Sequence, residues 1–241
     1  MKFVFIVEDK KDLALVDIVK ENIVQKNIEF IVYTIDENLK NSDFRFISEN
    51  LEKTITEVLE KENPYMIILH KKKVDPFISI ISKPEHIKIL DKFKKANFLF
   101  LEEGTTKIEK IGIILDFESE YDFSEFIQEA YKISTILDGE PEFVFSFYEE
   151  YYETALMKTH TGAEAKEIIN QMRQEEIENT KTIIAKALNG EHARLKVLSG
   201  DPKKRIPLYL HENKFDLAVL SHHTNHLDNY ISNIEISIAI I

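Results

Sequence analysis

The chain has 241 residues, a length that suits one large domain or two domains of about 120 residues. Its 43 Asp and Glu residues outnumber its 31 Lys and Arg residues, and the net charge of −12 argues against a protein that coats nucleic acid or an anionic membrane. The absence of Cys excludes disulfides, thiolate metal sites and a cysteine nucleophile. No apolar run reaches the roughly 18 residues of a membrane-spanning helix, and the N-terminal segment turns acidic too soon for a secretory signal, so we expect a cytoplasmic protein.

The first 104 residues alternate between strand-like and helix-like segments. Short apolar runs rich in β-branched residues predict strands at 2–7, 30–35, 65–69 and 98–101. Apolar residues spaced three and four apart predict helices over about 13–23 and 47–59, and a short helix precedes the last strand. One βα unit is missing compared with the second half, and we expect the lost strand to be the edge strand of a sheet ordered 3-2-1-4-5.

The second half follows the same alternation. Apolar runs predict strands at 110–115, 142–148, 193–198, 215–220 and 236–241. The longest of the helices between them is expected from about Ala163 to Leu188. Asp201 and Pro202 are typical of an N-cap and a first helical residue. Pro207 then falls inside that helix, which predicts either a kink there or a later start near Ile206.

Strands that alternate with helices predict parallel sheets with helices on both faces. Glu102–Thr106 is the only polar segment with a Gly near the midpoint, and it predicts the linker between domains 1–104 and 107–241. The halves also align: Val4–Glu8 matches Ile113–Asp116, and Met66–His70 matches Leu217–Ser221. The predicted fold class is therefore α/β, with two Rossmann-like parallel sheets in tandem.

Two segments of the second half resemble the universal stress protein family. Leu198-Ser199-Gly200-Asp201-Pro202 is similar to the family's Gly-Asp-Pro helix start, and Phe215–Leu220 is similar to the Asp-Leu-Ile-Val-Met-Gly strand that follows. Asp116 at the end of a first strand and the apolar strand Ser237–Ile241 add to the resemblance, which covers about Lys107–Ile241. It implies a tandem of two adenine-nucleotide alpha-hydrolase-like folds.

The resemblance also implies how the two halves associate. Members of this family often dimerise through their last strands, so strands 98–101 and 236–241 are expected to pair in a pseudo-dimer within the chain. Such pairing satisfies the free N–H and C=O groups of edge strands. Outside partners are then expected to be proteins or small ligands, with no nucleic acid and no membrane.

The resemblance places a nucleotide site at Asp116, Ser221, His222 and Thr224. In ATP-binding members a loop with three glycines follows the fourth strand, and its backbone N–H groups close around the phosphates. Here Ser221 and Thr224 stand at the first two glycine positions, and Ile234 stands at the third. The usual ATP loop is therefore expected to be lost.

Two neighbouring segments support this expectation. Phe117 replaces the Gly that follows the family's Asp, and its bulk would crowd a ligand beside Asp116. The matching segment of the first half, His70–Pro76, contains no Gly either. Within that segment, Lys71, Lys72 and Lys73 either hold an anion or form a solvated charge run.

A group of three histidines lies in the segment 221–226. His222 and His226 are four residues apart, so on one helical face they would suit Zn²⁺ or another divalent ion, with a carboxylate from Asp228 or Asp116. The alternatives are a polar loop whose imidazoles cap backbone groups or face solvent, and a loop that responds to pH.

The remaining residues carry no recognisable catalytic set. An aromatic stretch is expected to pack in the core, and its Tyr148–Tyr152 end is expected to extend over the ligand-binding crevice at the carboxyl ends of the strands. Its members are Phe143, Phe145, Phe147, Tyr148, Tyr151 and Tyr152. Nothing resembles a Ser-His-Asp set or a nucleophile elbow. We therefore expect a non-catalytic tandem protein that acts in stress response by binding, without a cofactor. The alternatives are an ATP- or AMP-binding protein with slow ATP hydrolysis and a metal-binding protein that uses His222 and His226.

Overall fold

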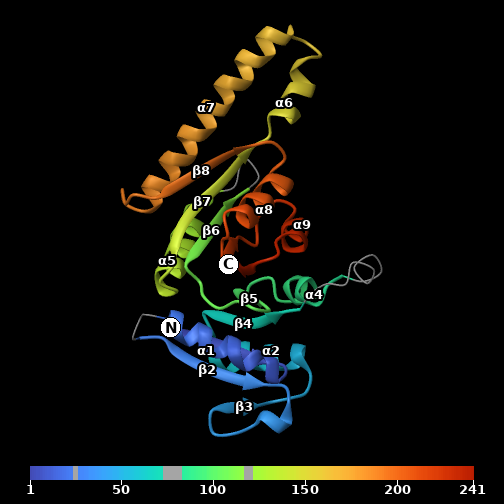
Figure 1. Ribbon diagram of the computed structural model, residues 1–241, viewed down its shortest axis with the longest axis vertical. Helices are drawn as coiled ribbons and strands as arrows, with labels where there is room; N and C mark the ends of the chain where they lie inside the picture. The colour runs from blue at the N-terminus through green and yellow to red at the C-terminus, as the bar shows by residue number, and fades with distance from the viewer. Residues whose placement is uncertain (24–26, 73–82, 117–121) are drawn as a thin grey trace.

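The computed structural model describes residues 1–23, 27–72, 83–116 and 122–241 (Figure 1). Its ten described strands form one sheet in the order β3-β2-β1-β4-β5-β10-β9-β6-β7-β8. Every neighbouring pair is parallel except β5 and β10, which are antiparallel. The predicted α/β class with a parallel sheet is confirmed, but the two halves share one continuous sheet instead of forming two. The two strands that join the halves are those expected to pair.

The first half supplies five strands. Its elements are β1 (Lys2–Val7), a 3-10 turn (Lys10–Asp12), α1 (Leu13–Asn22), β2 (Glu29–Thr34), a 3-10 turn (Glu37–Leu39), β3 (Phe44–Phe46), α2 (Leu51–Glu62), β4 (Met66–Lys71), α4 (Glu85–Lys92) and β5 (Phe98–Glu102). The expectation that the edge strand is lost was therefore wrong, because β3 pairs with β2 at the sheet edge. The connection between β2 and β3 contains a 3-10 turn and no α-helix, so the unit differs from a complete βα unit in its helix and not in its strand. The sequence analysis did not predict β3, because its three residues are too few to show the alternation typical of a strand.

The second half supplies the other five strands. Its elements are β6 (Lys110–Leu115), α5 (Ser124–Ile136), β7 (Glu140–Phe147), α6 (Glu149–Leu156), α7 (Gly162–Ala187), β8 (Arg194–Ser199), α8 (Pro202–Glu212), β9 (Leu217–Leu220), α9 (Leu227–Asn233) and β10 (Ser237–Ile240). Helix α8 begins at Pro202 and continues past Pro207, so the later start near Ile206 is excluded. The Asp201 side chain accepts a hydrogen bond from the Lys203 amide at 3.1 Å, which caps the helix.

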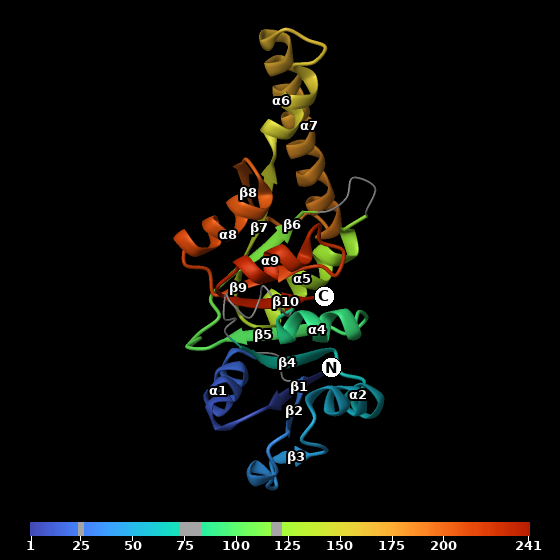
Figure 2. The ribbon, with the colours of Figure 1, turned by 90° about the vertical axis from the view of Figure 1, so that its right-hand side faces the viewer.

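Helices cover both faces of the sheet, because successive strand residues point to opposite sides. Phe3, Phe5 and Val7 pack on the face covered by α1, α5 and α7. Val4 and Ile6 pack on the other face, which α2, α4, α8 and α9 cover. Figure 2 shows α1 and α2 on opposite sides of β1 and β2. Buried on both faces, the central strands read as continuous apolar runs, which is why the sequence predicts them well.

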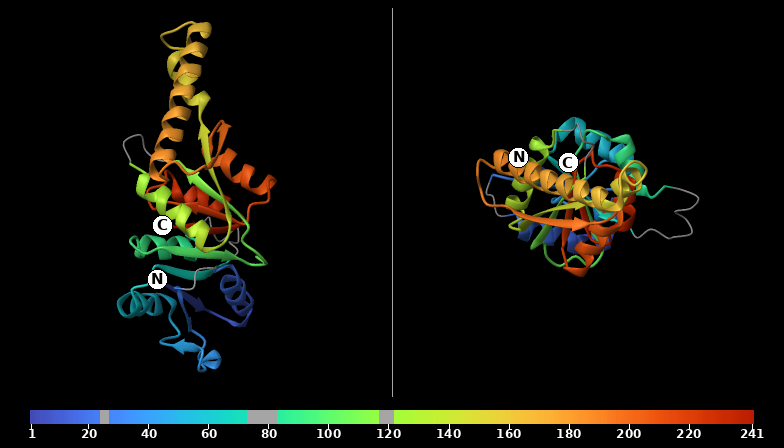
Figure 3. Two further views of the ribbon diagram at one scale, coloured as in Figure 1. Left: turned by 90° about the vertical axis from the view of Figure 1, so that its left-hand side faces the viewer. Right: turned by 90° about the horizontal axis from the view of Figure 1, so that it is seen from above.

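Helix α7 is the longest described helix, with 26 residues, and it extends past the end of the sheet (Figure 3). Helix α6 lies against its outer part, so the two form a projecting hairpin. Thr161 and Glu164 form a capping box at the start of α7. None of the helices in the described ranges is both long enough and apolar enough to span a membrane.

Candidate functional site

Each half has a point where its strand order reverses. In the first half β1 lies between β2 and β4, and in the second half β6 lies between β7 and β9. Helices leave such neighbouring strands in opposite directions, which opens a crevice at the carboxyl ends of the strands. Asp116 follows β6, and Glu8 follows β1, so each stands at the crevice of its half.

Asp116 is held by residues of its own chain. The hydroxyl of Tyr230, a fully buried residue of α9, donates to Asp116 Oδ2 at 2.5 Å. The Asn225 side chain donates to Oδ1 at 3.4 Å, and the Asn225 amide donates to the Asp116 carbonyl at 2.8 Å. Burial raises the pKa of Asp116, and the hydrogen bonds from Tyr230 and Asn225 oppose that rise only in part. The carboxylate is therefore bound internally on both oxygens.

The turn after β9 also satisfies its own backbone. The Ser221 amide donates to Thr224 Oγ1 at 3.0 Å, and the Thr224 amide donates to the Ser221 carbonyl at 3.0 Å. The His223 amide donates to Ser221 Oγ at 3.1 Å, and the His222 amide donates to the Ile241 carbonyl at 3.0 Å. With the Asn225 amide on Asp116, every N–H from residue 221 to residue 225 has an acceptor within the protein. The geometry needed for a phosphate cradle is the opposite, with several N–H groups aimed outward.

The two candidate metal ligands do not share a helical face. Helix α9 begins at Leu227, with His226 just before it in a left-handed conformation (φ 51°) and His222 in the preceding turn. His222 Nε2 lies 3.0 Å from the carbonyl oxygen of Ala96 in the first half. Burial lowers the pKa of His222. Across the described ranges, no three metal-ligating side chains come close enough to hold an ion.

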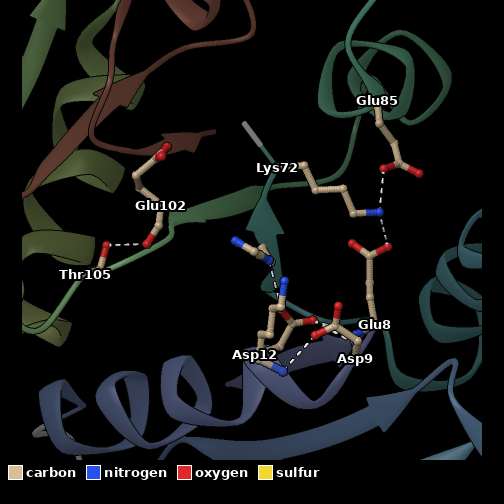
Figure 4. Close-up of polar contacts among 9 residues, drawn as sticks. Glu8, Asp9, Asp12, Lys72, Glu85, Glu102 and Thr105 are labelled. Carbon is tan, nitrogen blue, oxygen red and sulfur yellow. Dashed lines mark hydrogen bonds and ion pairs between the residues drawn. The ribbon is translucent and has the colours of Figure 1, made fainter. Parts of the chain in front are cut away.

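Lys71 and Lys72, from the predicted anion-binding segment of the first half, are paired with carboxylates and carbonyls. Lys72 Nζ lies 2.6 Å from Glu8 Oε2 and 2.8 Å from Glu85 Oε2, as Figure 4 shows. Lys71 is buried and donates to the carbonyls of Ile234 at 2.6 Å and Ile236 at 2.9 Å. Lys71 is a buried, paired charge, whereas Lys72 is half exposed but pairs with two carboxylates, so neither is a free anion site. Lys73 and Phe117 lie outside the described residues.

The sequence analysis did not predict a second polar group at the crevice of the first half, which consists of Asp12 and His70. Asp12 is fully buried, and its Oδ2 accepts the Glu8 and Asp9 amides at 2.7 and 3.3 Å. Its Oδ1 lies 2.9 Å from His70 Nδ1, a close polar contact that does not have the alignment of a hydrogen bond. Asp12 precedes the first residue of α1, and His70 is the last but one residue of β4, so the contact joins neighbouring elements of the crevice. The sequence signal was present: an acidic residue close after one strand end and a histidine at the next.

The space beside this group is small. Glu8, His70, Lys72 and His86 line a cavity of about 10 Å³, roughly the room for one water molecule. His86 is 4% exposed, its Nε2 has no hydrogen-bond partner in the described structure, and burial lowers its pKa to about 4. A carboxylate–histidine contact can support proton transfer, but a cavity of this size admits no organic substrate. The arrangement fits a buried polar cluster that ties β1 to β4.

A larger hollow lies in the second half, and Asp116 is one of the residues that line it. It measures about 720 Å³ and is bounded by β7, α6 and α7, with Asp116, Phe147, Tyr151, Tyr152 and Glu176 among its lining residues. The sequence predicts that Tyr148–Tyr152 extends over the crevice, and Tyr148, Tyr151 and Tyr152 do line this hollow.

Comparisons with known proteins agree with this architecture at the level of fold. No family model matches the chain, and no curated protein sequence does. A protein of unknown function from Pseudomonas aeruginosa PAO1 is similar with a TM-score of 0.68 and 13% identity, over 100% of this chain and 92% of that one. A protein provisionally named a universal stress protein, from P. aeruginosa UCBPP-PA14, is similar with a TM-score of 0.61 and 14% identity, over 100% of this chain and 92% of that one.

A universal stress protein from Archaeoglobus fulgidus DSM 4304 gives a TM-score of 0.53 at 9% identity, over 98% of this chain and 95% of that one. Identities this low establish similarity of the backbone alone. The chain therefore has the fold of the universal stress proteins.

Proposed function

We propose that this chain is a universal-stress-like protein of the cytoplasm that acts in stress response by binding a ligand or a protein, without catalysis and without ATP in the family's usual loop. The observation that carries this proposal is the turn after β9, whose amides from 221 to 225 all donate within the protein. A triphosphate would have to break these hydrogen bonds before it could gain any of its own, at about 1 kcal/mol or more for each.

The two carboxylates at the crevices support the same conclusion. Asp116 is occupied by Tyr230 and Asn225, and Glu8 by Lys72. We further propose that residues 1–104 and 107–241 are the two units of a tandem, joined as a pseudo-dimer. The antiparallel pairing of β5 with β10 supports this arrangement. The proposal includes no resident cofactor.

Equilibrium dialysis against labelled ATP with Mg²⁺ tests the proposal. We expect no saturable retention at micromolar nucleotide. Micromolar retention that is abolished by Asp116→Ala would contradict the proposal and restore the alternative of an ATP-binding protein. Elemental analysis of protein purified without chelators tests the absence of a metal, with His222→Ala plus His226→Ala as the variant that would remove one.

A further inference from the structure

The hollow between β7 and the α6–α7 hairpin has the size and lining of a ligand site. Its volume of about 720 Å³ lies within the range of small-molecule pockets, roughly 300 to 1,000 Å³. Six aromatic side chains line it, together with a similar number of polar and charged ones. It is distinct from the turn after β9, because none of the residues 221–226 lines it.

The aromatic side chains form a connected wall. Phe147 stacks on Tyr152 with ring centroids 5.2 Å apart, and Tyr151 meets Tyr152 edge-on at 5.4 Å. Tyr148 continues the wall, with its ring centroid 6.3 Å from that of Tyr151. Tyr151 is 67% exposed and Tyr148 is 36% exposed, so the outer part of this wall faces solvent, whereas Phe147 is buried. Aromatic faces attract cations through their quadrupole.

The charged groups of the hollow favour the same sign of ligand. Asp116, Glu175 and Glu176 line it, against one ammonium group from Lys186. Burial alone raises the pKa of Glu176, and no cation among the described residues offsets that effect. Burial and, after it, the charge of Glu176 raise the pKa of Tyr152, and both residues line the hollow. A carboxylate in this position gains free energy from a cation that displaces water.

The hydrogen-bonding capacity of the hollow narrows the class of cation. Both carboxylate oxygens of Asp116 are taken by Tyr230 and Asn225, and the Ser146 hydroxyl donates to the Gly200 carbonyl at 2.8 Å. A primary amine or a guanidinium must give each N–H group a directed acceptor, and the acceptors left in the hollow are the side chains of Glu175, Glu176 and Asn179 and two threonine hydroxyls. A fully alkylated ammonium ion has no N–H to satisfy, and aromatic cages suit such ions.

We infer that the hollow between β7 and the α6–α7 hairpin binds a quaternary alkylammonium ion, whose cationic head lies against Tyr151, Tyr152 and the Glu176 carboxylate. This inference rests on the proposed binding function and deepens it by naming a ligand class. Its main contacts, Tyr151, Tyr152 and Glu176, lie outside the turn after β9 on which the argument about ATP depends.

Titration calorimetry with choline and with its neutral isostere 3,3-dimethylbutan-1-ol tests the inference on the full chain. We expect choline to bind saturably and the neutral alcohol to bind at least about ten-fold more weakly, because only choline carries the charge. Glu176→Gln keeps the shape and should weaken choline binding about ten-fold. Tyr152→Leu should weaken it similarly, whereas Tyr152→Phe keeps the ring and should not.

Glu178→Gln is the matched control, because Glu178 lies two residues away on α7, pairs with Lys181 and does not line the hollow. Thermal unfolding of each variant shows whether it folds. Absence of choline binding, equal binding of the two probes, or unchanged choline binding by folded Glu176→Gln would overturn the inference. None of these results bears on ATP, so the dialysis experiment can fail or succeed independently.

Discussion

The Tyr230 hydroxyl donates to Asp116 Oδ2 at 2.5 Å, and this contact ties α9 to the end of β6 at the crevice of the second half. Tyr230 comes from α9, which follows the turn that would carry phosphate in an ATP-binding relative. The Tyr230 side chain is fully buried in the core on the face of the sheet that α2, α4, α8 and α9 cover. A ligand could therefore displace this hydroxyl from Asp116 only by disturbing the core. The helix that follows the turn thus supplies the partner for the carboxylate at the strand end.

Tyr230→Phe should destabilise the protein by about 1–3 kcal/mol near neutral pH, because the buried Asp116 carboxylate loses its main donor. The pKa of Asp116 is already raised by burial, and losing this hydrogen bond raises it further. The cost should therefore shrink as pH falls and Asp116 becomes protonated. Urea unfolding at about pH 7 and about pH 4 measures the loss of stability and its decrease in acid. Tyr148→Phe, on an exposed ring, is the control and should change little. A loss independent of pH would contradict this explanation.

His86 should make the protein sensitive to acid. Burial lowers its pKa to about 4, whereas in the unfolded chain it returns to about 6.5, so the unfolded state binds a proton more readily between these values. Stability from this residue is complete above about pH 6.5 and declines as the pH falls toward 4, by on the order of 3 kcal/mol. His86→Leu should flatten the pH dependence of urea unfolding over that window. The exposed His160, changed to Leu, should leave the slope as it is; an equal change in both variants would exclude His86 as the source.

Lys71→Met should loosen the junction between the halves. Lys71 Nζ holds two carbonyls next to β10 and lies 3.3 Å from Glu102 Oε2 at the end of β5. Removing the cation leaves these oxygens without their donor, at a cost of about 3 kcal/mol. Lys181→Met, which breaks an exposed pair with Glu178, should cost less than about 1 kcal/mol. Chemical denaturation compares the two, and similar small losses would show that Lys71 adds little to the junction.

Glu176→Gln should stabilise the folded chain near neutral pH even as it weakens cation binding. Burial raises the pKa of Glu176, so the folded state disfavours its ionised form and loses stability as pH rises through the raised pKa. Glutamine removes this cost, and below about pH 4.5, where wild-type Glu176 is protonated in both states, the two proteins should melt together. Thermal unfolding across this range tests the prediction. A variant that melts lower than wild type near neutral pH would contradict it.

The sequence predicted the fold well wherever burial on both faces leaves an apolar run. Strands such as β1, β4 and β6 are of this kind, and Asp201 and Pro202 marked the start of α8 correctly. It missed β3, because Phe44-Arg45-Phe46 is too short to show a period. It also assumed two sheets, since pairing across the linker is a tertiary contact that no local pattern encodes.

The candidate site was predictable only in part. The position of Asp116 at a strand end followed from the sequence, but its partner Tyr230 lies 114 residues away in the chain. His222 and His226 were placed on one helix because their spacing allows it, whereas a left-handed residue at His226 delays α9 to Leu227. Asp12 and His70 meet only because β1 and β4 are neighbours in the sheet. Contacts between elements therefore decided what local spacing could not.

Hydrogen exchange at the amides of residues 221–225, measured with and without Mg²⁺-ATP, tests the central claim most directly. The claim predicts slow exchange in the protein alone, since each of these amides donates internally, and no change when the nucleotide is added. Fast exchange in the protein alone that slows when ATP is added would show amides free to bind phosphate, and would contradict the claim.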